Sequence, residues 1–144
     1  LRPDLFGKIM TLATKFEWNE EIANNEIRML NPDIMEQKIP AFVEALKQQH
    51  KHIDWKKLVM NTSAMLTQLG KHPLLNAETL HAIQVPVQVG VGDKDAMVGI
   101  DETLAAFRSL KEGSFYLLPS TKHPFEMVDL SLLLPVLKHY FKLG

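Results

Sequence analysis

The sequence predicts an α/β fold with a short parallel sheet and flanking helices, and four segments near the carboxyl end carry this prediction. Residues 85–92 (VPVQVGVG) place valines on one face at a spacing of two, which is typical of a strand. Residues 101–110 have apolar residues at helical spacing, and residues 114–119 (SFYLLP) are a second candidate strand. A last amphipathic helix is expected over 131–141, with its first residue, a serine, as the cap. The order strand, helix, strand, helix predicts a parallel sheet.

The region before these segments predicts helices and almost no strand. Residues 9–16 (IMTLATKF) suit a short strand or the end of a helix. Residues 17–83 show several helical patterns with polar outer faces. Asn19 and Asp54 are expected helix N-caps. Gly70 is expected to stop the helix that begins near Asp54.

Composition and charge argue against several classes of function. The net charge of −1 is not that of a nucleic-acid binder, and it gives no electrostatic reason to lie on an anionic membrane. No apolar stretch has the length of a membrane span. The sequence has no cysteine, which excludes disulfides and cysteine-ligated zinc. The composition does not determine the cellular compartment, and we expect the cytoplasm.

Polar side chains follow both predicted strands at the point where each strand ends. Asp93 and Asp95 lie in GVGDKDAMV after the first strand, and His123 lies in PSTKHPFE after the second. Because the carboxyl ends of parallel strands meet at one edge, and neighbouring strands are about 5 Å apart, a carboxylate could reach the histidine. A carboxylate beside an imidazole fixes the protonated ring nitrogen and stabilises the imidazolium. This is the base half of a nucleophilic hydrolase.

Two apolar residues are candidates for contact with a substrate. Met97 follows Asp95, and Phe125 follows His123, so both lie on the loops at the predicted edge. Each polar candidate also has a purely structural interpretation, Asp95 as a turn residue and His123 as a surface residue. The remaining histidines lack metal-ligand spacing, so we expect no metal and no cofactor.

The run IQVPVQVGVGDKDAMV, followed by LLPSTKHPFE, resembles the carboxyl-terminal half of the α/β-hydrolase fold. In that superfamily a strand ends in a G-x-x-D turn that bears the triad acid, and the next strand ends in a loop that bears the triad histidine. Gly92 to Asp95 match the turn, and His123 matches the loop. The resemblance implies that Asp95 is the acid and that Asp93 is a turn residue.

The resemblance also implies a division into three parts: 1–16 as the last core strand before a cap, 17–83 as an inserted helical cap, and 84–144 as the carboxyl-terminal βαβα part of the hydrolase core. The G-x-S-x-G turn that bears the nucleophile is absent, because none of the five serines has the flanking glycines. The chain also begins without methionine. We therefore expect a fragment of a serine-nucleophile hydrolase of a small ester, lactone or related acyl substrate, inactive alone.

The expected partners are the small-molecule substrate and the missing amino-terminal half of the same protein, with self-association through the sheet edge near residues 9–16 as an alternative. The same fold also hosts non-catalytic ligand receptors, dehalogenases, carbon–carbon hydrolases and haloperoxidases, and these alternatives stay open. A flavodoxin-like binding module is disfavoured, because no glycine-rich phosphate loop opens a helix.

Overall fold

The computed structural model describes residues 5–143, which form two compact units. The first, here called the sheet unit, joins the described residues up to Glu17 with those from Leu75 onward. The second, the helical unit, spans Trp18–Leu74. Residues 1–4 of the expected first part lie outside the described residues.

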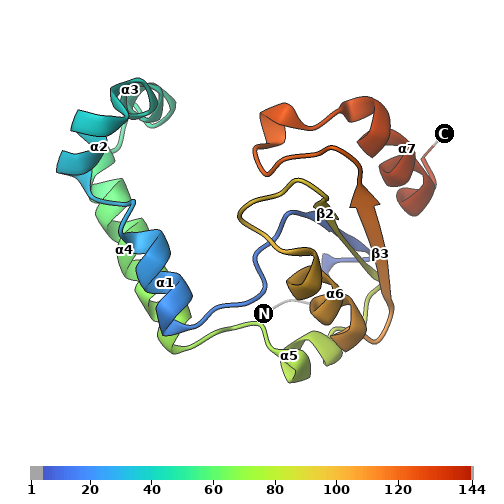
Figure 1. The fold of residues 1–144 in the computed structure, drawn as a ribbon. Coiled ribbons are helices and arrows are strands. Elements are labelled where there is room, and N and C mark those ends of the chain that lie inside the picture. Colours follow the sequence, from blue (N-terminus) through green and yellow to red (C-terminus); the bar gives the residue numbers. More distant parts are fainter. Residues whose placement is uncertain (1–4, 144) are drawn as a thin grey trace. The chain divides into compact units, whose positions relative to one another are not determined.

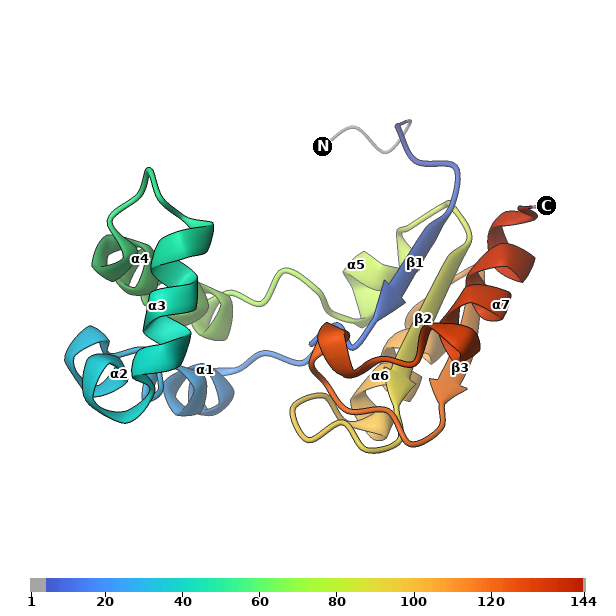
Figure 2. The ribbon, with the colours of Figure 1, turned by 90° about the horizontal axis from the view of Figure 1, so that it is seen from above.

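The sheet unit contains a parallel sheet of three strands in the order β1-β2-β3. These strands are β1 (Ile9–Leu12), β2 (Val87–Gly92) and β3 (Gly113–Leu118). Figure 2 shows them side by side and pointing in the same direction. In register, Ile9 lies opposite Val87, and Val87 lies opposite Gly113. The predicted short parallel sheet is confirmed, with β1 and β3 at its edges among the described residues.

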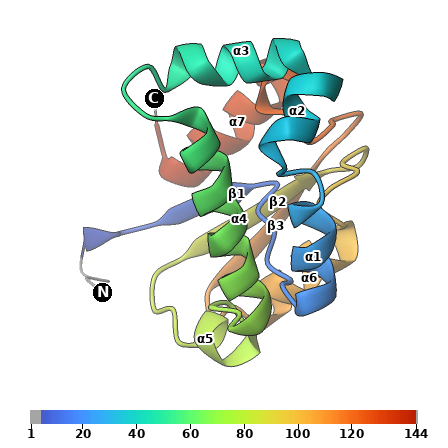
Figure 3. The same ribbon diagram turned by 90° about the vertical axis from the view of Figure 1, so that its left-hand side faces the viewer.

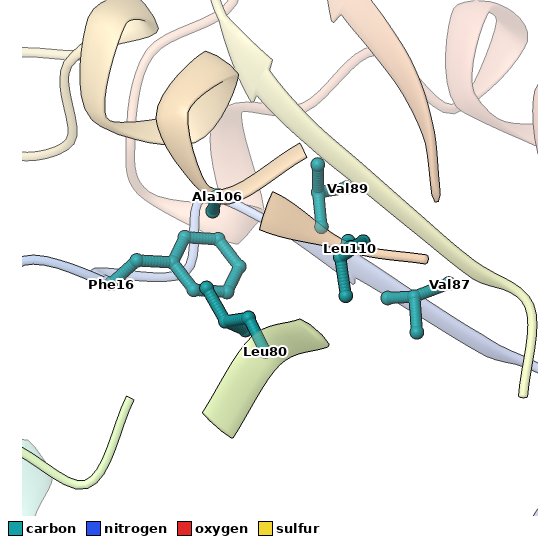
Figure 4. Packing of buried hydrophobic residues seen from close by; sticks show 6 residues of the cluster. All are labelled: Phe16, Leu80, Val87, Val89, Ala106 and Leu110. Atoms are coloured by element: carbon teal, nitrogen blue, oxygen red, sulfur yellow. The ribbon is translucent and has the colours of Figure 1, made fainter. Parts of the chain in front are cut away.

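Helices cover both faces of this sheet (Figure 1). One face carries α5 (Ala77–His81) and α6 (Ile100–Ser109), and the other carries α7 (Leu130–Phe141), which follows the short 3₁₀ helix η2 (Phe125–Met127). Two apolar cores result. The core under α5 and α6 consists of Phe16, Leu80, Val87, Val89, Ala106 and Leu110 (Figure 4). The core under α7 consists of Tyr116, Leu118, Val128 and Leu133.

The helical unit contains four helices (Figure 3): α1 (Glu20–Ile27), α2 (Pro32–Lys38), α3 (Pro40–Gln49) and α4 (Trp55–Lys71). The side chains of Asn19 and Asp54 accept backbone N–H groups at the starts of α1 and α4, so the predicted caps are confirmed. The core of this unit joins α2, α3 and α4 through Met35, Val43, Trp55 and Val59. None of the helices within residues 5–143 combines the length and apolar character that crossing a bilayer requires.

Two predicted helix boundaries are wrong. Gly70 lies inside α4, which ends at Lys71. A Cβ on Gly70 would lie 2.5 Å from the Cβ of Ala23, so this glycine permits close packing of α1 against α4 rather than ending the helix. The cap of α7 is Asp129, whose carboxylate accepts the N–H of Ser131, because the helix begins one residue before this serine.

The division of the chain into 1–16, 17–83 and 84–144 stays a prediction. The structure adds that α5, which lies in the middle range, belongs to the sheet unit. Its Leu80 packs in the same core as Val87 and Ala106.

Candidate active site

The carboxylate of Asp95 lies in the turn between β2 and α6, and both of its oxygens are engaged. Oδ1 accepts the backbone N–H groups of Met97 and Val98, each at 2.8 Å. Oδ2 lies 3.0 Å from Nδ1 of His123. The side chain is 0% exposed, so these contacts replace the water that a carboxylate would otherwise bind. The predicted hydrogen bond between Asp95 and His123 is confirmed, and Asp95 is held in one orientation.

His123 lies in the loop that follows β3, and its side chain is 31% exposed. Because Nδ1 faces Asp95, the Nδ1–H tautomer leaves Nε2 as the ring nitrogen for proton exchange. The imidazole lines a hollow of about 370 Å³ in the sheet unit. The other residues that line this hollow are Leu12, Ala13, Pro124, Phe125 and Glu126. The imidazole of His123 therefore lies between the buried carboxylate of Asp95 and an open hollow.

The loops that bear the acid and the histidine are tied together by a second aspartate. Oδ1 of Asp93 accepts the N–H of Thr121 at 3.2 Å, and the N–H of Lys94 donates to the Thr121 carbonyl at 3.1 Å. The N–H of Asp93 donates to the carbonyl of Leu118 at 3.0 Å. Thr121 is only 3% exposed, so the contact is sheltered from water. The two aspartates thus have different partners: Asp95 contacts the histidine itself, and Asp93 fixes the loop that carries it.

Gly92, the last residue of β2, allows the two loops to approach this closely. A Cβ at this position would lie 2.1 Å from the carbonyl oxygen of Thr121 and 2.7 Å from its carbon. The glycine is therefore needed for close approach. Sequence reasoning placed Gly92 in the motif but missed the bridge from Asp93 to Thr121, for which the only signal was a second carboxylate in GDKD.

The structure brings one of the two expected substrate-contacting residues to the hollow. Phe125 lines it and is 64% exposed. Met97 is 52% exposed but is not among the described residues that line the hollow, and its backbone N–H serves Asp95 instead. Their part in substrate binding stays a prediction. Ala13, which the sequence analysis missed, lines the hollow with a φ of 54°. Alanine gives no sequence signal for a left-handed backbone.

The hollow carries a mixture of polar and apolar groups. His123 and Glu126 contribute ionisable side chains, while Leu12 and Phe125 contribute apolar surface. Within residues 5–143, no group of three or more histidine, aspartate or glutamate side chains could hold a metal ion. The imidazole of His123, which lies beside the fixed carboxylate of Asp95, is suited to proton transfer.

Comparison with known proteins establishes the fold. No protein-family model and no curated protein matches the chain. Among solved structures, it is similar to a thermophilic esterase from Thermogutta terrifontis, with 16% identity and a TM-score of 0.63 over 97% of this chain and 57% of that one. It is also similar to 2-hydroxy-6-oxo-6-phenylhexa-2,4-dienoate hydrolase from a Rhodococcus species, with 16% identity and a TM-score of 0.64 over 98% and 57%. A third is NosK from Streptomyces actuosus, with 15% identity and a TM-score of 0.71 over 98% and 60%.

These similarities show that the chain has an α/β-hydrolase fold, with the elements expected for the carboxyl-terminal part of that fold. The chain spans less than two thirds of the length of each of these three structures. At such low identity the likeness concerns the fold alone, so the chemistry has to be argued from the site.

Proposed function

We propose that this chain supplies the acid and the general base of a serine-nucleophile hydrolase that acts on a small ester, lactone or related acyl substrate. The observation that carries the proposal is the buried carboxylate of Asp95, 3.0 Å from Nδ1 of a histidine that lines an open hollow. The nucleophile and the oxyanion donors would come from chain outside these 144 residues, because none of the serines stands in G-x-S-x-G.

In this mechanism Nε2 of His123 takes the proton of the serine hydroxyl as its oxygen attacks the acyl carbon. Asp95 stabilises the resulting imidazolium through the Nδ1–H bond. The proton then passes from Nε2 to the leaving-group oxygen, and the acyl group stays on the serine. A water molecule gives its proton to Nε2 and attacks the acyl group, which releases the acid and restores the serine.

The fixed orientation of Asp95 favours this role over that of a turn residue alone. Two backbone N–H groups hold Oδ1, so Oδ2 is aimed at the imidazole before any substrate arrives. Pre-organisation of this kind lowers a barrier, because the groups need not reorient during the reaction. A carboxylate that only closed a turn would have no need of the second contact.

The fold is similar to hydrolases of more than one substrate class. The TM-scores of 0.63 to the esterase and 0.64 to the phenylhexadienoate hydrolase are nearly equal. We favour acyl hydrolysis because the described residues of the site supply a base and an acid and nothing more specialised. Both substrates therefore belong in the test.

The test uses the full-length protein that contains this chain. Turnover is measured with p-nitrophenyl acetate and with 2-hydroxy-6-oxo-6-phenylhexa-2,4-dienoate, for the unmodified protein, Asp95→Asn, His123→Ala and the double variant. We expect Asp95→Asn to lower turnover by about 10⁴, and His123→Ala by at least as much. Because the pair acts as a unit, the double variant should be scarcely worse than His123→Ala.

His139→Ala is the matched control, because His139 is an exposed histidine near the end of α7. It should keep unmodified turnover. The isolated 144-residue chain should hydrolyse neither substrate faster than its His123→Ala form. Wild-type turnover in a folded His123→Ala protein would rule out the mechanism. Binding of either substrate without turnover would favour the non-catalytic receptor.

A further inference from the structure

Glu102 is a nearly buried carboxylate that contacts three donors from a distant segment. Its side chain is 9% exposed and lies in the first turn of α6. Oε2 accepts from Nζ of Lys15 at 3.0 Å, while Oε1 accepts the backbone N–H groups of Phe16 at 2.9 Å and Glu17 at 3.2 Å. Burying a carboxylate costs free energy unless it is paired. Here the pairing joins α6 to residues 15–17, 85–87 positions away in the chain.

These contacts lie beside the turn that holds Asp95. The turn runs from the end of β2 at Gly92 to Gly99, which precedes α6. Its first end is fixed by the bond between Asp93 and Thr121. Its second end continues directly into the helical turn that Glu102 anchors. The geometry of the Asp95 contacts therefore depends on both ends.

Lys15 gives a second, weaker link to the same turn. Besides its ion pair with Glu102, Nζ lies 3.4 Å from the carbonyl oxygen of Met97, a long hydrogen bond. The N–H of Met97 donates to Oδ1 of Asp95, whose Oδ2 faces His123. A series of contacts thus connects Glu102 to Asp95 through Lys15 and Met97.

We propose that Lys15 and Glu102 are positioning residues that hold Asp95 in hydrogen-bonding geometry with His123. The catalytic consequence rests on the proposed function, whereas the consequence for the hydrogen bond does not. Without the ion pair, Glu102 keeps only its two backbone donors, Phe16 and Glu17, and the first turn of α6 is held less firmly. The N–H groups of Met97 and Val98 then move relative to Oδ1, and Oδ2 loses its alignment with the imidazole.

The same contacts link the acid to the segment where the chain leaves the sheet unit. Phe16 and Glu17, whose N–H groups bind Glu102, are the last residues before the helical unit begins at Trp18. A change in the path of these residues would therefore disturb Glu102, and with it the turn that carries Asp95. Through these two hydrogen bonds, Glu102 couples the conformation of this connection to the candidate active site.

The experiment follows the Nδ1–H proton of His123 by NMR in the full-length protein, using Glu102→Gln and Lys15→Met. Both variants should move the Nδ1–H resonance and speed its exchange with water by about tenfold, the factor expected for losing one charge-assisted hydrogen bond. Lys15→Arg keeps the positive charge and should restore the resonance. In the turnover assay, kcat should fall by between about tenfold and a hundredfold with little change in KM.

Two controls separate positioning from loss of stability. Asp101→Asn removes a carboxylate from the same first turn of α6, where Asp101 is exposed. Lys111→Met removes an exposed ammonium group whose Nζ is 3.1 Å from Gln84 Oε1. Neither control should move the resonance. A general loss of stability reduces the folded fraction but leaves the resonance of the folded molecules in place.

Unchanged resonance and exchange in Lys15→Met, with only a lower free energy of unfolding, would overturn the inference. This variant decides the matter if Glu102→Gln fails to fold, because Lys15 is the more exposed partner. A shifted resonance in a protein that hydrolyses nothing would retain the positioning role and reject the proposed function. Loss of turnover in His123→Ala, together with an unmoved resonance in Glu102→Gln and Lys15→Met, would retain the proposed function and reject the positioning role.

Discussion

The replacement Gly92→Ala tests whether the close approach of the two site loops is necessary. An added Cβ would lie 2.1 Å from the carbonyl oxygen of Thr121 and 2.9 Å from its side-chain Cβ. The obstacle is mainly backbone, which cannot swing aside as the end of a side chain can. The loop bearing His123 must therefore move away from the end of β2.

The free-energy cost of this movement has two parts, overpacking and the loss of hydrogen bonds. Overpacking of a well-packed site costs about 1–3 kcal/mol. Moving Thr121 also stretches its bonds with Lys94 and Asp93, at 3.1 Å and 3.2 Å. Losing one of these adds about 1 kcal/mol to the cost. We therefore expect the free energy of unfolding to fall by about 2–4 kcal/mol.

The effect on turnover should be large as well, because a misplacement of about 1 Å can cost about a hundredfold in rate. The measurements are urea denaturation and turnover in the full-length protein. Gly7→Ala is the matched control, since a Cβ there would meet nothing within 4 Å. The packing argument is refuted if the free energy of unfolding of Gly92→Ala lies within about 0.5 kcal/mol of that of the unmodified protein and its turnover is unchanged.

Two further outcomes are expected in the sheet unit. Burial raises the pKa of Tyr116 to about 12, so the folded state keeps a proton that the unfolded state loses near pH 10. The free energy of unfolding should therefore fall as pH rises from about 10 to 12, and Tyr116→Phe should weaken this fall in urea titrations. An unchanged pH dependence in the variant would contradict the assignment. The N–H groups of Ile9 and Ala13 donate to the carbonyls of Pro86 and Gly90, so those of Met10 and Leu12 face away from β2, on a strand that is at the edge of the sheet among the described residues. The isolated chain should therefore self-associate in sedimentation, and a monomer with slowly exchanging Met10 and Leu12 amides would count against this.

Local signals made much of the fold predictable. Asn19 and Asp54 cap helices because a side-chain oxygen satisfies N–H groups only a few residues away, and this preference is visible in the sequence. The alternating valines of β2 marked a strand, and their burial follows from its central place in the sheet. The contact between Asp95 and His123 was predictable for a similar reason, because neighbouring parallel strands bring their carboxyl ends together.

Contacts between distant segments were not predictable where neither a motif nor the pairing of strands indicated them. Gly70 looked like a helix stop, but its role depends on Ala23 in another helix. Glu102 is one of two acidic residues in the first turn of α6, and nothing in the local sequence shows that its partners are residues 15–17. Phe42 in α3 and Met60 in α4 are large apolar residues of amphipathic helices, yet they are 56% and 64% exposed. Apolar periodicity shows that a helix has an apolar face, but not whether the described chain covers it.

The two aspartates of GDKD illustrate how the site divides structural and chemical demands. Asp93 accepts one backbone N–H, from Thr121, with one side-chain oxygen, and a neutral amide oxygen could accept the same bond. Asp95 accepts two N–H groups at Oδ1 and faces a ring nitrogen at Oδ2, so all of its partners act as donors when Nδ1 carries the proton. An amide cannot satisfy all three, because its NH₂ group donates. Acceptor oxygens on both sides of Asp95 therefore favour the Nδ1–H tautomer of His123, and an ionised carboxylate in this place is what would stabilise an imidazolium at His123.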